Sequence, residues 1–127
     1  MRKNRVQFPA ARHFDTFSVN MITYDDFKKV ELKTAKVLSA ERIEGSDKLL
    51  KLEVEVGEET RPLVAGIGKA YDLETLVGKM IIIVANLEPK SLLGHESRGM
   101  LLAASEDGGA PMLLTIDGDI ASGADIR

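Results

Sequence analysis

The stretch LLKLEVEV at 49–56 constrains the fold more than any other part of the chain. From position 50 onward, a Leu or Val alternates with a Lys or Glu at every second residue. Successive side chains of a strand point to opposite faces, so this pattern is typical of a strand with one buried and one exposed face. The sequence therefore predicts an antiparallel sheet that packs one face against a core.

Two neighbouring segments extend this sheet. Residues 31–44 contain Val and Thr and predict a long strand in which apolar and polar residues do not alternate regularly. Residues 61–67 predict a third strand. The connections at 45–47 and 57–59 are short and each contains a glycine, as expected for turns. Three consecutive strands with short connections make a meander.

The second half of the chain predicts further strands. The run MIIIVANL at 80–87 is apolar without alternation and predicts a strand buried on both faces. The run at 100–105 is expected to pair with residues 111–116 across a turn at 107–109, where two glycines follow an aspartate.

Two short helices interrupt the strands. Thr23 and Asp26 have the spacing of a capping box and predict a helix over about 24–29. Asp72 is expected to cap a second helix that ends at Gly78, between the third and fourth strands. This element order is that of the OB-fold, a five-stranded Greek-key barrel in an all-β class, although an SH3-like barrel also fits.

The termini differ from this domain. Residues 1–20 carry four basic side chains and one acidic one, without a clean period or a secretory apolar core. We expect a flexible basic extension here, followed by one domain over 21–127; an incorrectly assigned start before Met21 and a docking extension are the alternatives. The tail 117–127 is a turn-rich C-terminal extension in which Ile120 and Ile126 are candidate anchors.

Composition excludes several classes of protein. Hydrophobic residues make up 44% and charged residues 29%, as in ordinary globular domains, and no apolar run approaches the roughly 20 residues that cross a bilayer. There is no cysteine, which fits a reducing, cytoplasmic location. The net charge is −3, and because residues 1–20 contribute +3, the domain itself carries −6. Any nucleic-acid site on it must be a local basic patch.

The candidate motifs for catalysis and metal binding are incomplete. Gly66-Ile67-Gly68-Lys69 lacks the earlier glycine of a phosphate loop, because position 63 is leucine. The loop 94–99 contains His, Glu and Ser without nucleophile-elbow spacing, and His13 lies far from His95. We expect neither an enzyme, nor a metal, nor a cofactor.

The polar loop between the apolar runs at 80–85 and 100–104 is the candidate site. Asn86 and Ser97 can donate to phosphate or ribose, Lys90 and Arg98 supply positive charge, and Met100 offers an apolar surface to a base. The alternative is a solvated connection with incidental charges. The loop has no aromatic residue, which favours recognition of the shape and backbone of structured RNA over base stacking.

At this loop the chain resembles a known family. VANLEPKSLLGHESRGMLLAAS, with ELKTAKVLSAERIEGSDKLLKLEVEVG and RPLVAGIGKAY before it, is similar to the tRNA-binding domain at the C-terminus of bacterial and archaeal methionyl-tRNA synthetases. The same domain occurs in free-standing tRNA-binding proteins and in the endothelial monocyte-activating polypeptide II family. The resemblance covers about residues 22–127. It implies an OB-fold whose C-terminal extension forms a homodimer. It also implies shape-based tRNA binding without catalysis, by a protein that either assists a methionyl-tRNA synthetase as a separate subunit or acts free-standing.

The resemblance also implies which residues contact tRNA. The positions carried over are Asn86, Lys90, Ser97 and Met100, with Lys33 and Lys36 on the first strand as backbone contacts. Two departures stand out: Glu88 replaces a residue that is often basic, which should weaken phosphate attraction, and Thr34-Ala35 replace Val-Gly.

A related branch of export-related, peptide-binding chaperones is the alternative function on the same barrel. Members of that branch lack the Gly-Met pair after the loop serine. The run Ser97-Arg98-Gly99-Met100 therefore favours the tRNA-binding branch for this chain.

Overall fold

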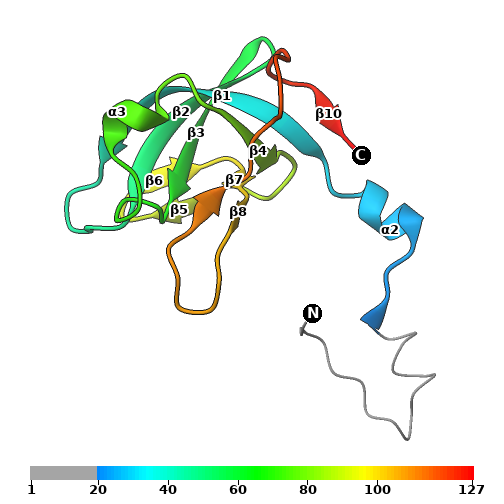
Figure 1. The fold of residues 1–127 in the computed structure, drawn as a ribbon, viewed down its shortest axis with the longest axis horizontal. Coiled ribbons are helices and arrows are strands. Elements are labelled where there is room, and N and C mark those ends of the chain that lie inside the picture. The colour runs from blue at the N-terminus through cyan, green and yellow to red at the C-terminus, as the bar shows by residue number, and fades with distance from the viewer. Residues whose placement is uncertain (1–19) are drawn as a thin grey trace, which may run out of the picture.

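The computed structural model describes residues 20–127 (Figure 1). The predicted flexible extension over 1–20 lies, apart from Asn20, outside the described residues. The elements in chain order are α2 (Tyr24–Lys28), β1 (Leu32–Arg42), β2 (Leu50–Val56), β3 (Glu59–Ala65), α3 (Leu73–Leu76), β4 (Met80–Val84), β5 (Lys90–Leu92), β6 (His95–Ser97), β7 (Met100–Leu101), β8 (Ala103–Ala104), β9 (Met112–Leu113) and β10 (Asp125–Ile126).

The main sheet is antiparallel and follows the order β3-β2-β1-β4-β7, with β10 paired to the start of β1. In chain order, the helix α3 lies between β3 and β4. The sheet curls on itself into a partial barrel (Figure 1). The predicted all-β, five-stranded OB-like barrel is therefore confirmed.

The core lies inside the curl. On β2 the predicted alternation is confirmed, because residues 50, 52, 54 and 56 are all buried and the charged residues between them are not. Ile81 and Ile83 of β4 are fully buried in the same core, and so is Leu76 of α3. Ile82 is only half-buried, so β4 is more one-sided than its apolar run predicts.

Strand β1 bends because it carries a bulge. Its register with β2 shifts between Val37 and Ser39, which leaves Leu38 unpaired and exposed. A bulge increases local twist. The bend lets one half of β1 pair with β4 while the other half pairs with β2.

The helix predictions are met in one case and corrected in the other. At α2 both hydrogen bonds of the Thr23–Asp26 capping box are present. At α3 the N-cap position is Asp72 as predicted, but its side chain makes no capping hydrogen bond. The backbone carbonyl of Asp72 instead accepts from the N–H and the hydroxyl of Thr75.

The segment predicted as an open loop between residues 88 and 99 contains a hairpin, β5–β6, in which Lys90 pairs with Ser97. Its turn is Leu93-Gly94, and both residues have positive φ, 48° and 82°. Two such residues define the tight turn that matches strand twist, but Leu is an unusual choice there. The strands show no apolar alternation, which is why the hairpin was not predicted.

The C-terminal extension docks onto β1. The N–H of Thr34 donates to the Ala124 carbonyl (3.0 Å), and the Gly123 N–H donates to the Thr34 carbonyl (2.7 Å). The Thr34 hydroxyl donates to the Ala121 carbonyl and accepts from the Ala124 N–H, both at 2.9 Å. Thr34 is consequently buried, although its side chain points away from the barrel core.

Candidate nucleic-acid interface

The hairpin β5–β6 is attached to the barrel through Ser97. The Ser97 hydroxyl accepts from the Val64 N–H at 2.9 Å and donates to the Gly99 carbonyl at 3.0 Å. The Arg98 N–H donates to the Pro62 carbonyl, so the end of β6 is tied to the free edge of β3. Ser97 is buried and its hydroxyl is committed to these two bonds. Its direct contact with RNA stays a prediction.

Asn86 also has internal partners. Its side-chain carbonyl accepts from the Glu31 N–H at 2.9 Å, and its amide donates to the Lys29 carbonyl at 2.7 Å. These bonds fix the end of β4 against the link between α2 and β1. Contact between Asn86 and RNA likewise stays a prediction.

The base of the hairpin is tied together by Arg61, a residue that the sequence analysis did not select. One terminal nitrogen of its guanidinium, Nη1, donates to the carbonyls of Ala85 and Arg98, which lie just before and just after the hairpin. The side chain is mostly buried. Arg61 therefore joins the end of β4 to the end of β6.

Three predicted residues remain accessible around the hairpin. Lys90 is exposed on β5, and Met100, at the start of β7, is 48% exposed. Arg98 is partly exposed, and its Nη2 lies 3.4 Å from Oε2 of Glu59. These side chains can reach a ligand without breaking the barrel.

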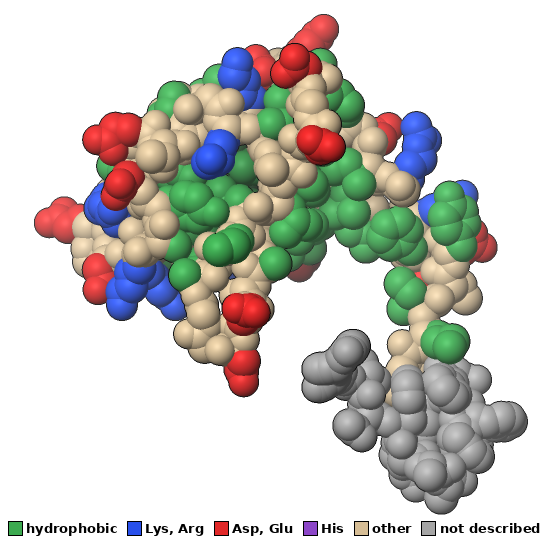
Figure 2. Space-filling view, in the orientation of Figure 1, with side chains coloured by type: hydrophobic (Ala, Val, Ile, Leu, Met, Phe, Trp, Pro, Cys, Tyr) green, Lys and Arg blue, Asp and Glu red, His purple; other side chains and the backbone are tan. Residues whose placement is uncertain are grey.

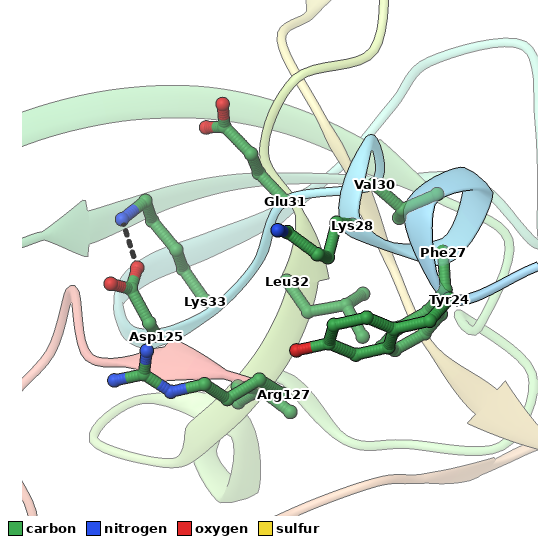
Figure 3. Close-up of a pocket in the computed structure, with 10 residues that line it drawn as sticks. Tyr24, Phe27, Lys28, Val30, Glu31, Leu32, Lys33, Asp125 and Arg127 are labelled. Atoms are coloured by element: carbon green, nitrogen blue, oxygen red, sulfur yellow. Dashed lines mark hydrogen bonds and ion pairs between the residues drawn. The ribbon is translucent and has the colours of Figure 1, made fainter.

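The two lysines on β1, Lys33 and Lys36, have different surroundings. Nζ of Lys33 is 2.6 Å from Oδ1 of Asp125, and this hydrogen bond and positive charge hold the pKa of the Asp125 carboxyl below its usual range. Lys33 lines a groove of about 420 Å³ between α2 and β10, with Asp125 beside it and Tyr24 across the groove (Figure 3). Lys36 is exposed in the middle of β1. Neither is among the residues that fix the hairpin.

A cluster of cations beside the hairpin was missed by the sequence analysis. Arg42 donates to the Gly68 carbonyl at 2.9 Å, the Gly68 N–H donates to the Lys48 carbonyl at 2.7 Å, and Lys69 forms an ion pair with Asp47 at 3.7 Å. We call Arg42, Lys48 and Lys69 the turn cluster, because they surround the β1–β2 turn.

The turn cluster adjoins the hairpin. A Cβ atom built on Gly45, in the β1–β2 turn, would lie 4.0 Å from Cδ1 of Leu93 at the hairpin tip. Lys and Arg side chains gather at the same end of the molecule, at the lower left of Figure 2. The OB-fold order could have revealed this cluster, because OB-folds bind nucleic acid with the loops after strands one and four.

Gly68 makes the cluster possible. A Cβ at this position would lie 2.8 Å from the Lys48 carbonyl oxygen and 3.1 Å from Nη1 of Arg42. The close approach of the two turns therefore requires glycine. The motif Gly66-Ile67-Gly68-Lys69 is thus a packing site between turns.

Residues 32–125, from the start of β1 to the start of β10, match the model of a family described as "Putative tRNA binding domain". The chain belongs to this tRNA-binding domain family. The resemblance stated from the sequence is confirmed.

Two similar methionine–tRNA ligases are much longer than this chain. The domain is 56% identical over 108 residues to methionine–tRNA ligase of Caldanaerobacter subterraneus subsp. tengcongensis, and 54% identical over 107 residues to that of Thermotoga maritima. The matches cover 85% and 84% of the chain. The chain spans only 17% of the length of each relative.

Two solved structures share the fold of the domain along almost their whole length. A MetRS-related protein from Pyrococcus horikoshii has a TM-score of 0.81 at 37% identity, covering 85% of this chain and 99% of that one. The chaperone CsaA from Bacillus anthracis has a TM-score of 0.78 at 29% identity, covering 84% and 99%.

Two further findings concern the part of the chain that the structure describes. No helix in residues 20–127 is long and apolar enough to cross a membrane. Within the same range, no three His, Asp or Glu side chains form a group that could hold a metal ion.

Proposed function

We propose that this chain is a non-catalytic tRNA-binding domain that recognises the shape and backbone of tRNA in the cytoplasm. The observation that carries the proposal is the family match over residues 32–125. The named relatives are methionine–tRNA ligases. We therefore propose that the domain assists a methionyl-tRNA synthetase, on one chain or as a separate subunit, by raising the local concentration of tRNA.

The proposed contact surface is the end of the barrel that carries the hairpin and the turn cluster. It combines the turn cluster with Lys90, Arg98 and Met100. Among the described residues, aromatic side chains occur only at Tyr24, Phe27 and Tyr71, none of them in the hairpin or the β1–β2 turn. A surface of cations without aromatic platforms suits backbone and shape recognition.

The remaining predicted contacts have different parts in this proposal. Lys36 is exposed and stays a candidate for a phosphate contact, as does Lys33 if RNA displaces Asp125. Asn86 and Ser97 contribute by holding the ends of the hairpin in place. Glu88 is exposed before β5 and should lower the affinity by repelling phosphate.

Titration of unfractionated tRNA into the fluorescently labelled protein at several KCl concentrations tests the proposal. For about three to four phosphate contacts the log–log salt slope should be roughly −3, using the duplex coefficient. The Lys48→Gln and Lys90→Gln variants should each weaken binding and reduce the magnitude of the slope by about 0.7–0.9, because each removes one contact.

Lys28→Gln is the matched control. It removes the same charge from α2, which lies at the opposite end of the barrel from the β1–β2 turn (Figure 1), and should leave binding unchanged. Absence of tRNA binding at low salt would refute the proposed function. Equal losses for all three variants would refute the assigned surface.

The alternative function is an export-related, peptide-binding chaperone. The observation in its favour is the fold shared with CsaA from Bacillus anthracis and from Picrophilus torridus. Purification of the protein from cells, followed by sequencing of any RNA and polypeptide that remain bound, separates the two functions. Mature tRNA supports the proposal, whereas enrichment of unfolded polypeptide without RNA supports the chaperone.

We also propose that the domain forms a homodimer in which the C-terminal extension takes part. In its favour, Ile120 of the extension is 47% exposed, and Ile22 and Tyr24 at the start of α2 are more exposed still. Tyr24 and Val30 line one groove with Ile126 of the extension, and apolar side chains gathered on a surface are typical of protein–protein contacts.

A further inference from the structure

One carboxylate, that of Glu59, lies between two guanidinium groups at the base of the hairpin. Its Oε2 atom is 3.2 Å from Nε of Arg61 and 3.4 Å from Nη2 of Arg98. The two arginines differ in freedom. The Arg61 side chain is 17% exposed, whereas those of Arg98 and Glu59 are 42% and 44% exposed.

Arg61 is held in place by the backbone and is not available to a ligand. Its Nη1 atom donates to the Ala85 and Arg98 carbonyls. Its Nε is buried and close to Glu59 without hydrogen-bond geometry, so the contact between them is an ion pair alone. Arg61 therefore positions the hairpin and also brings positive charge to Glu59.

Arg98 has no comparable restraint on its side chain. Its backbone is fixed, because its N–H donates to Pro62 and its carbonyl accepts from Arg61, but the guanidinium is bound through Glu59 alone among the described residues. Because a carboxylate and a phosphate compete for the planar donors of a guanidinium, a phosphate that binds both terminal nitrogens of Arg98 has to displace Glu59 from Nη2.

We propose that Glu59 limits the affinity of this domain for tRNA by holding Arg98 against β3. This inference rests on the proposed function. It makes Glu59, which lies outside the predicted contact loop, a residue that weakens tRNA binding. Loss of the carboxylate charge frees Arg98 for one additional phosphate contact and removes a negative charge beside it.

The test compares Glu59→Gln with Glu58→Gln in tRNA titrations over a series of KCl concentrations. Glutamine preserves the size of the side chain and removes its negative charge. Glu58 is the adjacent residue, is exposed, and forms no ion pair with any residue in 20–127, so E58Q changes net charge equally without releasing an arginine.

E59Q should bind tRNA about two- to five-fold more tightly than E58Q, the size expected for one exposed ion pair. Its salt slope should be steeper by about 0.7–0.9, as expected for one more phosphate contact. The double variant E59Q/R98Q should bind tRNA no more tightly than E58Q, because it lacks the arginine that E59Q releases.

A second variant keeps the test decisive if E59Q folds poorly. R98Q alone should weaken tRNA binding less than K90Q does, because Glu59 withholds Arg98 in the wild-type domain. Equal losses for R98Q and K90Q would show that Arg98 already binds RNA, which overturns the inference.

The outcomes separate this inference from the proposed function. If wild-type protein binds tRNA but E59Q binds no more tightly than E58Q, the inference is refuted and the function stands. If neither wild type nor E59Q binds tRNA at low salt, both are refuted.

Discussion

Ser97 shows how one hydroxyl can close a barrel. The edges of β3 and of the strands after the hairpin do not form a continuous ladder, and the Val64 N–H on β3 is satisfied by the Ser97 hydroxyl. A buried N–H that loses its only partner pays its full desolvation cost. Ser97 therefore stabilises the barrel directly, and it fixes the hairpin by attaching it to β3.

We expect Ser97→Ala to lower the free energy of unfolding by about 1 kcal/mol, because the part-buried Val64 N–H loses its hydrogen-bond partner. Urea denaturation followed by circular dichroism measures this change. Ser91→Ala is the matched control, because Ser91 is exposed on the same hairpin and its hydroxyl has no hydrogen-bond partner within the described part of the chain. Equal stability of both variants would contradict the structural role of Ser97.

At the scale of elements, the C-terminal extension is held against β1, where Thr34 makes four hydrogen bonds to it. Thr34 uses its N–H, its carbonyl and its hydroxyl to bind the segment 121–124, and β10 then pairs with Leu32 and Lys33. Ser122 adds bonds to Glu55 and to the Gly57 N–H. The extension is thus an edge strand of the same domain.

Thr34→Val should release the extension while preserving side-chain shape. Two hydrogen bonds are lost in a buried position, so we expect a loss of about 1–3 kcal/mol in stability, and faster amide exchange at Ala124. Thr60→Val on β3 is the control, because residue 60 is exposed and its hydroxyl forms no hydrogen bond with residues 20–127. Unchanged exchange at Ala124 in T34V would show that the backbone bonds alone hold the extension.

At the scale of the whole molecule, the homodimer proposal needs a test that leaves the barrel intact. Deletion of residues 117–127 would remove the hydrogen bonds to Thr34 and Gly57 together with any dimer contact. A point change at an exposed apolar side chain avoids this ambiguity.

Ile120→Asp should shift wild-type dimers toward monomers by at least about ten-fold in the dissociation constant, because a charge placed in an apolar interface loses its hydration. Light scattering after size-exclusion chromatography, at several protein concentrations, measures the shift. Val77→Asp is the control, since Val77 is similarly exposed but follows α3, away from the extension. A monomeric wild-type protein, or equal dissociation in both variants, would refute the proposal.

The sequence by itself determined the order and type of the main elements. The alternation on β2, the capping box at Thr23 and the turn at Gly45 depend on residues a few positions apart, and local periodicity reports which face is buried. The predicted OB-like barrel followed from that order. The family resemblance likewise depended on short runs of consecutive residues around the hairpin.

Only the tertiary structure decided which side chains meet. Ser97 bonds to Val64, Arg98 pairs with Glu59, and Thr34 binds Ala124, partners that are 33, 39 and 90 residues apart. The hairpin β5–β6 carries no apolar alternation, so its pairing depends on the barrel to which Arg61 and Ser97 attach it. Such contacts arise from the curl of the sheet, which brings distant edges together, and no local pattern encodes them.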